Sequence, residues 1–537
     1  MLTVELALAL FLAVAAIGAV AKWLPVPLSI LLVAGGAALS YVPGLSRVEV
    51  APQLFFLLFV PPLLFSDGWL FPKREFLAFL RPILLLAFGL VAATVVAVGY
   101  LMHWLIPSLP LAAAFALGAI VSPTDAVATE SVTRRLPLPP RVTHIVNGES
   151  LINDASGLVA FKFAVAEVAT GTFSWVDATG QLVLLAGGGA LAGFAVALVV
   201  GYARVALIDL CVDDPKIQTI ISLLTPYAAY LAAEALQVSG VLAVVTAGLY
   251  AGVHDSRHLS VATRRHAWEV WAMVLYLLNG LAFLLLGLQL KPVMVAMPRE
   301  SWLSLAGYAL FLYAIITVVR LVWVYPGTYL PLLLSERLRR REGWRDPRAV
   351  FLVGWAGIRG SVTLAAALSV PLAGAAGAAF PGRELIVFLA GTTIVLTLCI
   401  NGLTLPTLIR MLNLPRDGAA LREERIARHA MAQAGAAAMR TAMGRAKDPG
   451  ATAYAQSLLA YYERQMRRHS ADDAQRAEFD SIDAGERRLR RLALAAERGE
   501  LHALRDTAVI NDETLRTIEA EIDHAESLLT TDVPIHP

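Results

Sequence analysis

Residues 118–128 read GAIVSPTDAVA, and this stretch decides how the chain is interpreted. Pro123 interrupts a long apolar run near its middle, where it removes a backbone donor and clashes with the preceding helical turn. The freed carbonyl groups and the hydroxyls of Ser122 and Thr124 are then available to a cation. Asp125 follows directly. The structural alternative is a proline kink in which Asp125 is the N-cap of the next helical segment.

The composition indicates that the broken run lies in a membrane. Of 537 residues, 57% are apolar and 16% are charged, whereas soluble domains carry about a quarter charged residues. Apolar runs near the roughly 20 residues that cross a bilayer recur from Leu2 to Leu414. We predict an all-α polytopic protein with about 13 transmembrane helices, over 2–21, 24–42, 53–65, 80–106, 111–133, 150–170, 182–207, 217–237, 240–253, 268–290, 302–334, 350–371 and 385–412.

The basic residues predict the topology and the domains. Lys and Arg concentrate in every second loop, which places the N-terminus outside and the C-terminus in the cytoplasm of an inner-membrane protein. We expect a transmembrane domain over 1–414 and a cytoplasmic helical domain over 415–537. In the latter, helices are expected over 420–445, 452–468 and 473–529, the last broken at Gly499 and 509–511. This tail is either solubilising, or regulatory and dimer-stabilising.

A second stretch, NGESLINDA at 147–155, combines two acids with amide and hydroxyl groups. Ser150 and Asp154 are four residues apart and share a helix face. A buried carboxylate that holds either H⁺ or a dehydrated Na⁺ is the minimum equipment for ion exchange. A capping cluster at a helix start is the alternative. It explains Glu149 but not Asp154, which lies more than a turn into the expected span.

The third stretch, GWAGIRGSVTLA at 354–365, is broken by glycines that flank Arg359. Glycine lets the backbone leave helical geometry without steric penalty. Arg359 cannot lose its proton, so it needs an acid, and we predict a structural ion pair with Glu149. The two broken spans are the fifth and the twelfth, and this spacing is typical of inverted-repeat transporters with two discontinuous crossing helices.

These stretches, with FFLLFVPPLLF at 55–65, resemble signatures of the sodium/proton exchanger (NhaP/NHE-type) family of monovalent cation:proton antiporters. The resemblance implies a homodimer whose subunits have core and dimerisation subdomains. It implies that Asp154 carries the ion or proton and that Asn153 goes with electroneutral exchange. Thr124 and Ser150 would supply oxygens to Na⁺, Asp125 a carboxylate in the unwound stretch, and Glu149 and Arg359 an internal salt bridge; Asp67 is an auxiliary candidate.

We therefore expect an antiporter that exchanges Na⁺ or Li⁺ for H⁺ by alternating access and serves cytoplasmic pH and sodium homeostasis. No enzymatic activity, cofactor or nucleic-acid partner is expected. A K⁺/H⁺ antiporter of the same fold, a cation channel, and an intramembrane aspartyl protease using Asp125 and Asp154 are the alternatives. The sequence assigns no role to Lys162, Glu167 or Arg320.

Overall fold

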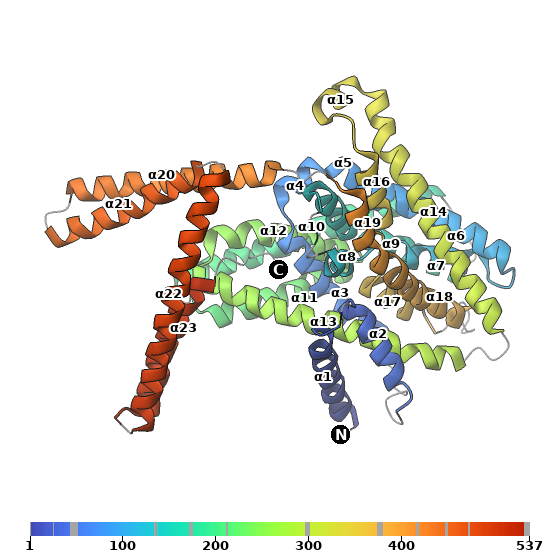
Figure 1. The fold of residues 1–537 in the computed structure, drawn as a ribbon. Helices are drawn as coiled ribbons and strands as arrows, with labels where there is room; N and C mark the ends of the chain where they lie inside the picture. The colour runs from blue at the N-terminus through green and yellow to red at the C-terminus, as the bar shows by residue number, and fades with distance from the viewer. Residues whose placement is uncertain are drawn as a thin grey trace. The chain divides into compact units, whose positions relative to one another are not determined.

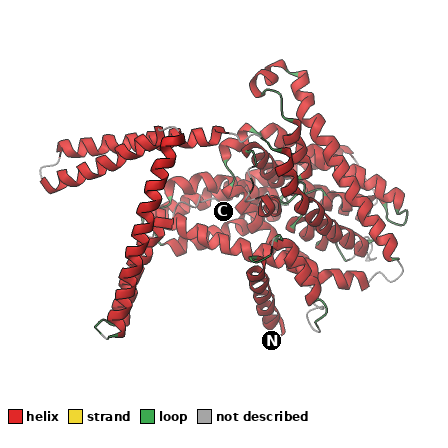
Figure 2. Cartoon of the chain, in the orientation of Figure 1, coloured by secondary structure: helices red, strands yellow, loops and turns green. Residues whose placement is uncertain are grey.

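The computed structural model describes residues 2–24, 26–42, 52–133, 136, 138–170, 175–210, 213–295, 301–372, 380–414, 418–445, 449–470, 473–507 and 509–530. Over these ranges the regular elements are helices, with no strand among them (Figure 2). The expected all-α fold is confirmed. The chain divides into two compact units, Met1–Arg416 and Asp417–Pro537.

The first unit contains nineteen α-helices and two π-helical segments among its described residues (Figure 1). In chain order they are α1 (Leu2–Ala21), α2 (Leu28–Leu39), α3 (Pro52–Leu70), α4 (Lys73–Ala78), α5 (Leu80–Leu84), η2 (Leu85–Leu90), α6 (Val91–Leu105), α7 (Leu111–Val121), α8 (Ala126–Thr133), α9 (Pro140–Thr170), α10 (Trp175–Asp209), α11 (Pro215–Ala235), α12 (Gly240–His258), α13 (Val261–Val295), α14 (Trp302–Leu334), α15 (Glu336–Glu342), α16 (Pro347–Trp355), α17 (Ser361–Leu368), α18 (Arg383–Leu396), η4 (Thr397–Gly402) and α19 (Leu403–Leu412).

Helices occupy all the expected spans, but length and composition identify fewer crossings. Among the described residues, the five long apolar segments that could cross a membrane are Leu80–Leu105, Leu184–Asp209, Val261–Gln289, Trp302–Leu334 and Arg383–Leu412. Shorter apolar helices, such as Leu28–Leu39 and Leu111–Val121, add to these. The number of crossings, about 13, therefore stays a prediction.

Both expected helix breaks are present. The proline-containing span ends as α7 at Val121 and resumes as α8 at Ala126. The glycine-containing span ends as α16 at Trp355 and resumes as α17 at Ser361. Helix α17 packs against α3, α7 and α18, which brings the second break into the interior of the unit.

Other helices of the first unit pack closely enough to need glycine. A Cβ atom on Gly36 of α2 would lie 2.1 Å from the carbonyl oxygen of Leu284 on α13. One on Gly193 of α10 would lie 2.0 Å from the carbonyl oxygen of Ala243 on α12. Only glycine permits such an approach of two backbones. Gly189 and Gly193 thus let α10 approach neighbouring backbone closely.

The sixth span differs from its prediction because α9 begins at Pro140 instead of Ser150. The added residues include polar side chains such as Asn147, which is half-buried within the protein. A prediction based on long apolar runs misses a helix start that contains polar residues packed against the protein. The correction matters because Glu149 and Asp154 lie well inside a helix, so the alternative of a capping cluster at a helix start is excluded.

The second unit consists of four described helices: α20 (Gly418–Arg445), α21 (Pro449–Ser470), α22 (Asp473–Asp506) and α23 (Asp512–Thr530). Helix α20 packs against α21, and α22 against α23 (Figure 1). The break expected near 509–511 is present, but the one expected at Gly499 is wrong because α22 continues through it. A glycine inside a helix costs about 1 kcal/mol relative to alanine, which packing against α23 offsets.

Candidate functional site

The two helix breaks meet at Asp125. Its backbone N–H donates to the carbonyl oxygen of Ile358, 2.8 Å away in the other break. Its Oδ1 accepts from the N–H of Ala128 at 2.9 Å, and its Oδ2 from the N–H of Ser361 at 3.2 Å. The side chain therefore caps the N-termini of both α8 and α17. The predicted alternative, an N-capping aspartate, is therefore part of the role of Asp125. In addition, Asp125 joins the two helix breaks to each other.

Gly360 makes this junction possible. A Cβ atom at this position would lie 1.6 Å from Asp125 Oδ2. No side chain can be accommodated without moving the carboxylate away from the N-terminus of α17. The glycines around Arg359 thus do two things: they let the backbone leave helical geometry, and Gly360 lets the two breaks lie close together.

Helix α9 passes the junction and contributes four buried polar side chains. Glu149, Ser150, Asn153 and Asp154 are each 5% exposed or less. Asn153 Nδ2 donates to Thr124 Oγ1 at 2.8 Å, and Thr124 Oγ1 lies 3.1 Å from Ser150 Oγ. Thr124 also donates to Glu149 Oε1 at 3.4 Å. This network holds the first break against α9.

Asp154 stands apart from that network. Its buried Oδ1 atom has no hydrogen-bond partner among the described residues. The side chain lines a cavity of about 20 Å³, and roughly 10–15 Å³ is enough for one water molecule. The polar side chains around the cavity come from five parts of the fold: Asp67, Thr124, Asp125, Ser150, Asp154, Asn279, Ser361 and Thr363.

The structure thus brings most of the predicted site residues to one cavity. Thr124, Asp125, Ser150 and Asp154 line it, and so does the auxiliary candidate Asp67 on α3. Asn153 lies outside the lining, because its amide nitrogen faces Thr124 and Glu149.

Sequence reasoning missed three further polar lining residues, Asn279, Ser361 and Thr363. Asn279 lies on α13, where a polar residue in an apolar helix is the only sequence signal. Thr363 is 1% exposed, and its Oγ1 has no hydrogen-bond partner among the described residues. It lies inside the glycine-rich stretch, but nothing there distinguishes it from its neighbours.

The predicted ion pair between Glu149 and Arg359 is wrong. Glu149 pairs instead with Arg320 of α14: Arg320 Nη1 donates to its Oε1, and Nη2 donates to its Oε2 at 2.7 Å. The two side chains are 1% and 3% exposed. Two parallel N–H···O bonds to one carboxylate give the strong, geometrically specific form of this pair.

Arg359 has a different set of partners. Its Nε donates to the carbonyl oxygen of Val121 at 2.7 Å, and its Nη1 to that of Gly357 at 3.0 Å. Its backbone N–H donates to Thr397 Oγ1 of η4 at 3.1 Å. The acid that Arg359 was expected to need is replaced by carbonyl oxygens, since Val121 is the last residue of α7 and its carbonyl has no helical partner.

The charged side chains at the breaks complement the ends of the four half-helices α7, α8, α16 and α17. Arg359 lies at the C-terminus of α7, and Arg320 lies at that of α16, where it donates to the carbonyl oxygens of Val353 and Gly354 at 3.0 Å. Asp125 faces the N-termini of α8 and α17. Helix C-termini carry partial negative charge and N-termini partial positive charge, so each end meets its complement.

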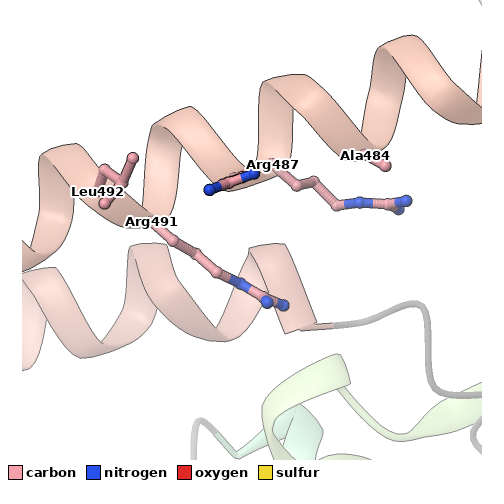
Figure 3. A pocket seen from close by; sticks show the side chains of 5 residues that line it. Ala484, Arg487, Arg491 and Leu492 are labelled. Carbon is pink, nitrogen blue, oxygen red and sulfur yellow. The ribbon is translucent and has the colours of Figure 1, made fainter.

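Other charged groups lie elsewhere. Lys162 of α9 pairs with Glu234 of α11 at 2.9 Å, and both side chains are exposed. In the second unit, a hollow of about 350 Å³ on α22 is lined by Arg487, Arg488 and Arg491 (Figure 3). Its positive charge disfavours a cation there.

Comparisons with known proteins identify the family of the chain. The family described as "Sodium/hydrogen exchanger, transmembrane" matches residues 8–411. The chain is 38% identical to an uncharacterised Na⁺/H⁺ exchanger of Escherichia coli, YjcE, over 95% of this chain and 96% of that one. It is 40% identical to a sodium, potassium, lithium and rubidium/H⁺ antiporter of Bacillus pumilus, over 72% of this chain and 58% of that one.

A solved structure has a related fold. The sodium proton antiporter MjNhaP1 of Methanocaldococcus jannaschii superposes with a TM-score of 0.58 at 18% identity, over 77% of this chain and all of that one. At this level of identity the likeness concerns the fold alone. The part of this chain that it covers is consistent with the extent of the first unit.

Proposed function

Because the chain belongs to the sodium/hydrogen exchanger family and is a cation/proton antiporter by that membership, we propose that it exchanges Na⁺ for H⁺ at Asp154. One observation carries the proposal. Asp154 presents a buried, unpaired carboxylate oxygen to a cavity sized for a single ion, at the meeting point of two broken helices. Broken helices at such a point are the usual ion sites of secondary transporters.

The charge balance of the cavity favours a cation or a proton. Its wall carries three carboxyl groups, Asp67, Asp125 and Asp154, whereas Arg320 and Arg359 are not among the lining residues. Buried charges are costly unless they are compensated. Either bound protons or a metal cation supplies that compensation, and the two compete for the same oxygens.

The coordination we propose uses Asp154 as the exchanging group, with Thr124 and Ser150 as neutral oxygen ligands. Their hydroxyl groups lie 3.1 Å apart at the same cavity. Asp125 fixes the junction of the breaks, and Asp67 is an auxiliary acid. Asn153 acts indirectly, because its amide holds Thr124 in place. Glu149 with Arg320, and Arg359 separately, hold the half-helices.

The transport cycle follows from competition for one carboxylate. Asp154 releases a proton and takes a Na⁺ on one side, and the core subdomain then moves relative to the dimerisation subdomain. An unoccupied, ionised site is costly to move through the membrane, which couples one cation to one proton and makes exchange electroneutral. We further propose a homodimer in the inner membrane, with the N-terminus outside and the second unit in the cytoplasm.

K⁺ is the second candidate cation. The printed name of the Bacillus pumilus relative includes potassium and rubidium beside sodium and lithium. The candidate ligands are carboxylate and hydroxyl oxygens, which bind any of these ions, so selectivity rests on small differences in cavity size and ligand field.

The test is a proteoliposome assay with an internal pH dye. Na⁺, Li⁺ and K⁺ are added in turn, with and without an imposed voltage. We expect cation-driven proton movement that the voltage leaves unchanged. Asp154→Asn abolishes it, whereas the matched control Asp214→Asn retains it, because asparagine caps the exposed start of α11 equally well.

Three results would contradict the proposal. Exchange by Asp154→Asn would exclude this residue as the shared group. Voltage-driven cation flux without proton movement would indicate a channel, and cleavage of peptides in detergent that requires Asp125 and Asp154 would indicate a protease. A response to K⁺ larger than that to Na⁺ would select the second cation.

A further inference from the structure

The residues around the Asp154 cavity include a second buried polar atom without a partner. Thr363, in the first turn of α17, lines the same cavity as Asp154 and is buried. Neither Thr363 Oγ1 nor Asp154 Oδ1 has a hydrogen-bond partner among the described residues. A buried polar group without a hydrogen bond costs about 1–3 kcal/mol. Two such atoms at one small cavity indicate a bound species that interacts with both.

The break between α16 and α17 explains why this hydroxyl group is unpaired. Inside a helix, a threonine hydroxyl commonly donates to the carbonyl oxygen four residues earlier, as Thr219 does to Pro215 at 2.7 Å in α11. The residue four positions before Thr363 is Arg359, which lies in the break, because α17 begins at Ser361. The usual local acceptor is therefore not in helical register, and the hydroxyl group of Thr363 is left for a ligand.

We propose that Thr363 is a further ligand of the transported cation, which it binds through Oγ1 together with Asp154. The inference rests on the antiport proposed above. It adds a hydroxyl ligand from the second break to Thr124, the hydroxyl ligand from the first. The two breaks are joined by Asp125, whose Oδ2 accepts from the N–H of Ser361, two residues before Thr363. The two hydroxyl ligands are thereby held in one rigid junction.

The variant Thr363→Val separates a ligand role from a structural role. It removes the hydroxyl group and nearly keeps the side-chain shape, and the loss of an unpaired buried polar group is neutral or stabilising. Without Na⁺ the melting midpoint should therefore stay unchanged or rise. The further rise that Na⁺ produces should be smaller than in the wild type, because a ligand stabilises the protein in proportion to its affinity. A structural hydroxyl group would instead give a lower midpoint without Na⁺.

The transport experiment measures KM and kcat for Na⁺ in proteoliposomes with an internal pH dye. Thr363→Val is expected to raise KM about tenfold, equal to about 1.4 kcal/mol, with a smaller change in kcat. Thr363→Ser keeps the hydroxyl group and should retain the KM of the wild type. The matched control is Thr393→Val on α18. Thr393 Oγ1 is also buried without a partner among the described residues, but Thr393 does not line the cavity, so KM should not change.

A second variant, Thr363→Ala, covers the case in which Thr363→Val does not fold, and the same rise in KM is expected. An unchanged KM in these variants would mean that the hydroxyl group binds water only, and it overturns the ligand role while the antiport stands. An equal rise in Thr393→Val or in Thr363→Ser does the same. So does a failure of both Thr363→Val and Thr363→Ala to fold, because the hydroxyl group would then be structural. A wild-type protein without any cation/proton exchange overturns the antiport and this inference together.

Discussion

The strongest energetic prediction concerns the ion pair between Glu149 and Arg320. Arg320 makes two hydrogen bonds to Glu149 and one each to the carbonyl oxygens of Val353 and Gly354. Breaking a buried ion pair by removing one partner costs about 3–5 kcal/mol, because the other charge stays buried and uncompensated. Glu149→Gln is expected to fall in this range.

Arg320→Gln is expected to cost more. It leaves the Glu149 carboxylate alone and also removes the donors to two carbonyl oxygens of α16, at about 1–3 kcal/mol for each unsatisfied buried group. The double variant leaves no uncompensated charge. Its loss should therefore be smaller than the sum of the two single losses, by a coupling of about 0.5–3 kcal/mol.

The assay is thermal unfolding of the purified protein in one detergent. The four proteins of the cycle are heated at one fixed rate, because irreversible melting midpoints depend on the heating rate. The control cycle pairs Glu149→Gln with Arg359→Gln and should show a smaller coupling, because Arg359 bonds to carbonyl oxygens. Additive losses in the first cycle, or an equal or larger coupling to Arg359, would refute the assignment.

Three further variants test the junction and its surroundings. Gly360→Ala should lower the melting midpoint and transport, because its Cβ would lie 1.6 Å from the Asp125 carboxylate. The control Gly307→Ala, with no atom within 4 Å of a new Cβ, should be neutral or slightly stabilising. Equal melting midpoints and transport in the two variants would contradict the close approach of Gly360 to Asp125. Asp125→Ala should melt well below Asp125→Asn, since asparagine keeps one capping oxygen; equal midpoints would argue against capping. Asp255→Asn should lower the free energy of unfolding by about 3–5 kcal/mol, because it breaks the buried ion pair with Arg204 at 2.8 Å. The ratio of Na⁺ to H⁺ exchanged, measured with tracer Na⁺ and a pH dye, should stay unchanged. An altered ratio would place this ion pair in the transport path.

The two helix breaks and the acid Asp154 can be predicted from the sequence because each depends on residues close to it in the chain. Pro123 and the clustered glycines around Arg359 disfavour helical geometry within their apolar runs, although single residues such as Pro226 in α11 and Gly499 in α22 lie inside continuous helices. Asp154 is conspicuous as a carboxylate deep in an apolar segment. These features depend on neighbouring residues only. They therefore locate the Asp154 cavity correctly without knowledge of the packing.

The sequence fails where the outcome depends on which distant helices face each other. Two buried arginines were available to Glu149, and the long Arg320 side chain of α14, not Arg359, reaches it. Arg320 lies in an uninterrupted apolar run, where a solitary charge is the only signal. Asn279 reaches the cavity from α13 for the same nonlocal reason.

The central claim is that one carboxylate binds Na⁺ or H⁺ but never both. Calorimetric Na⁺ titration of the detergent-solubilised protein, repeated in two buffers of different ionisation enthalpy, counts the protons released per cation bound. The account predicts one proton per Na⁺ for the wild-type protein and neither binding nor release for Asp154→Asn. Na⁺ binding to the wild type without proton release, or unchanged binding and release in Asp154→Asn, would contradict it.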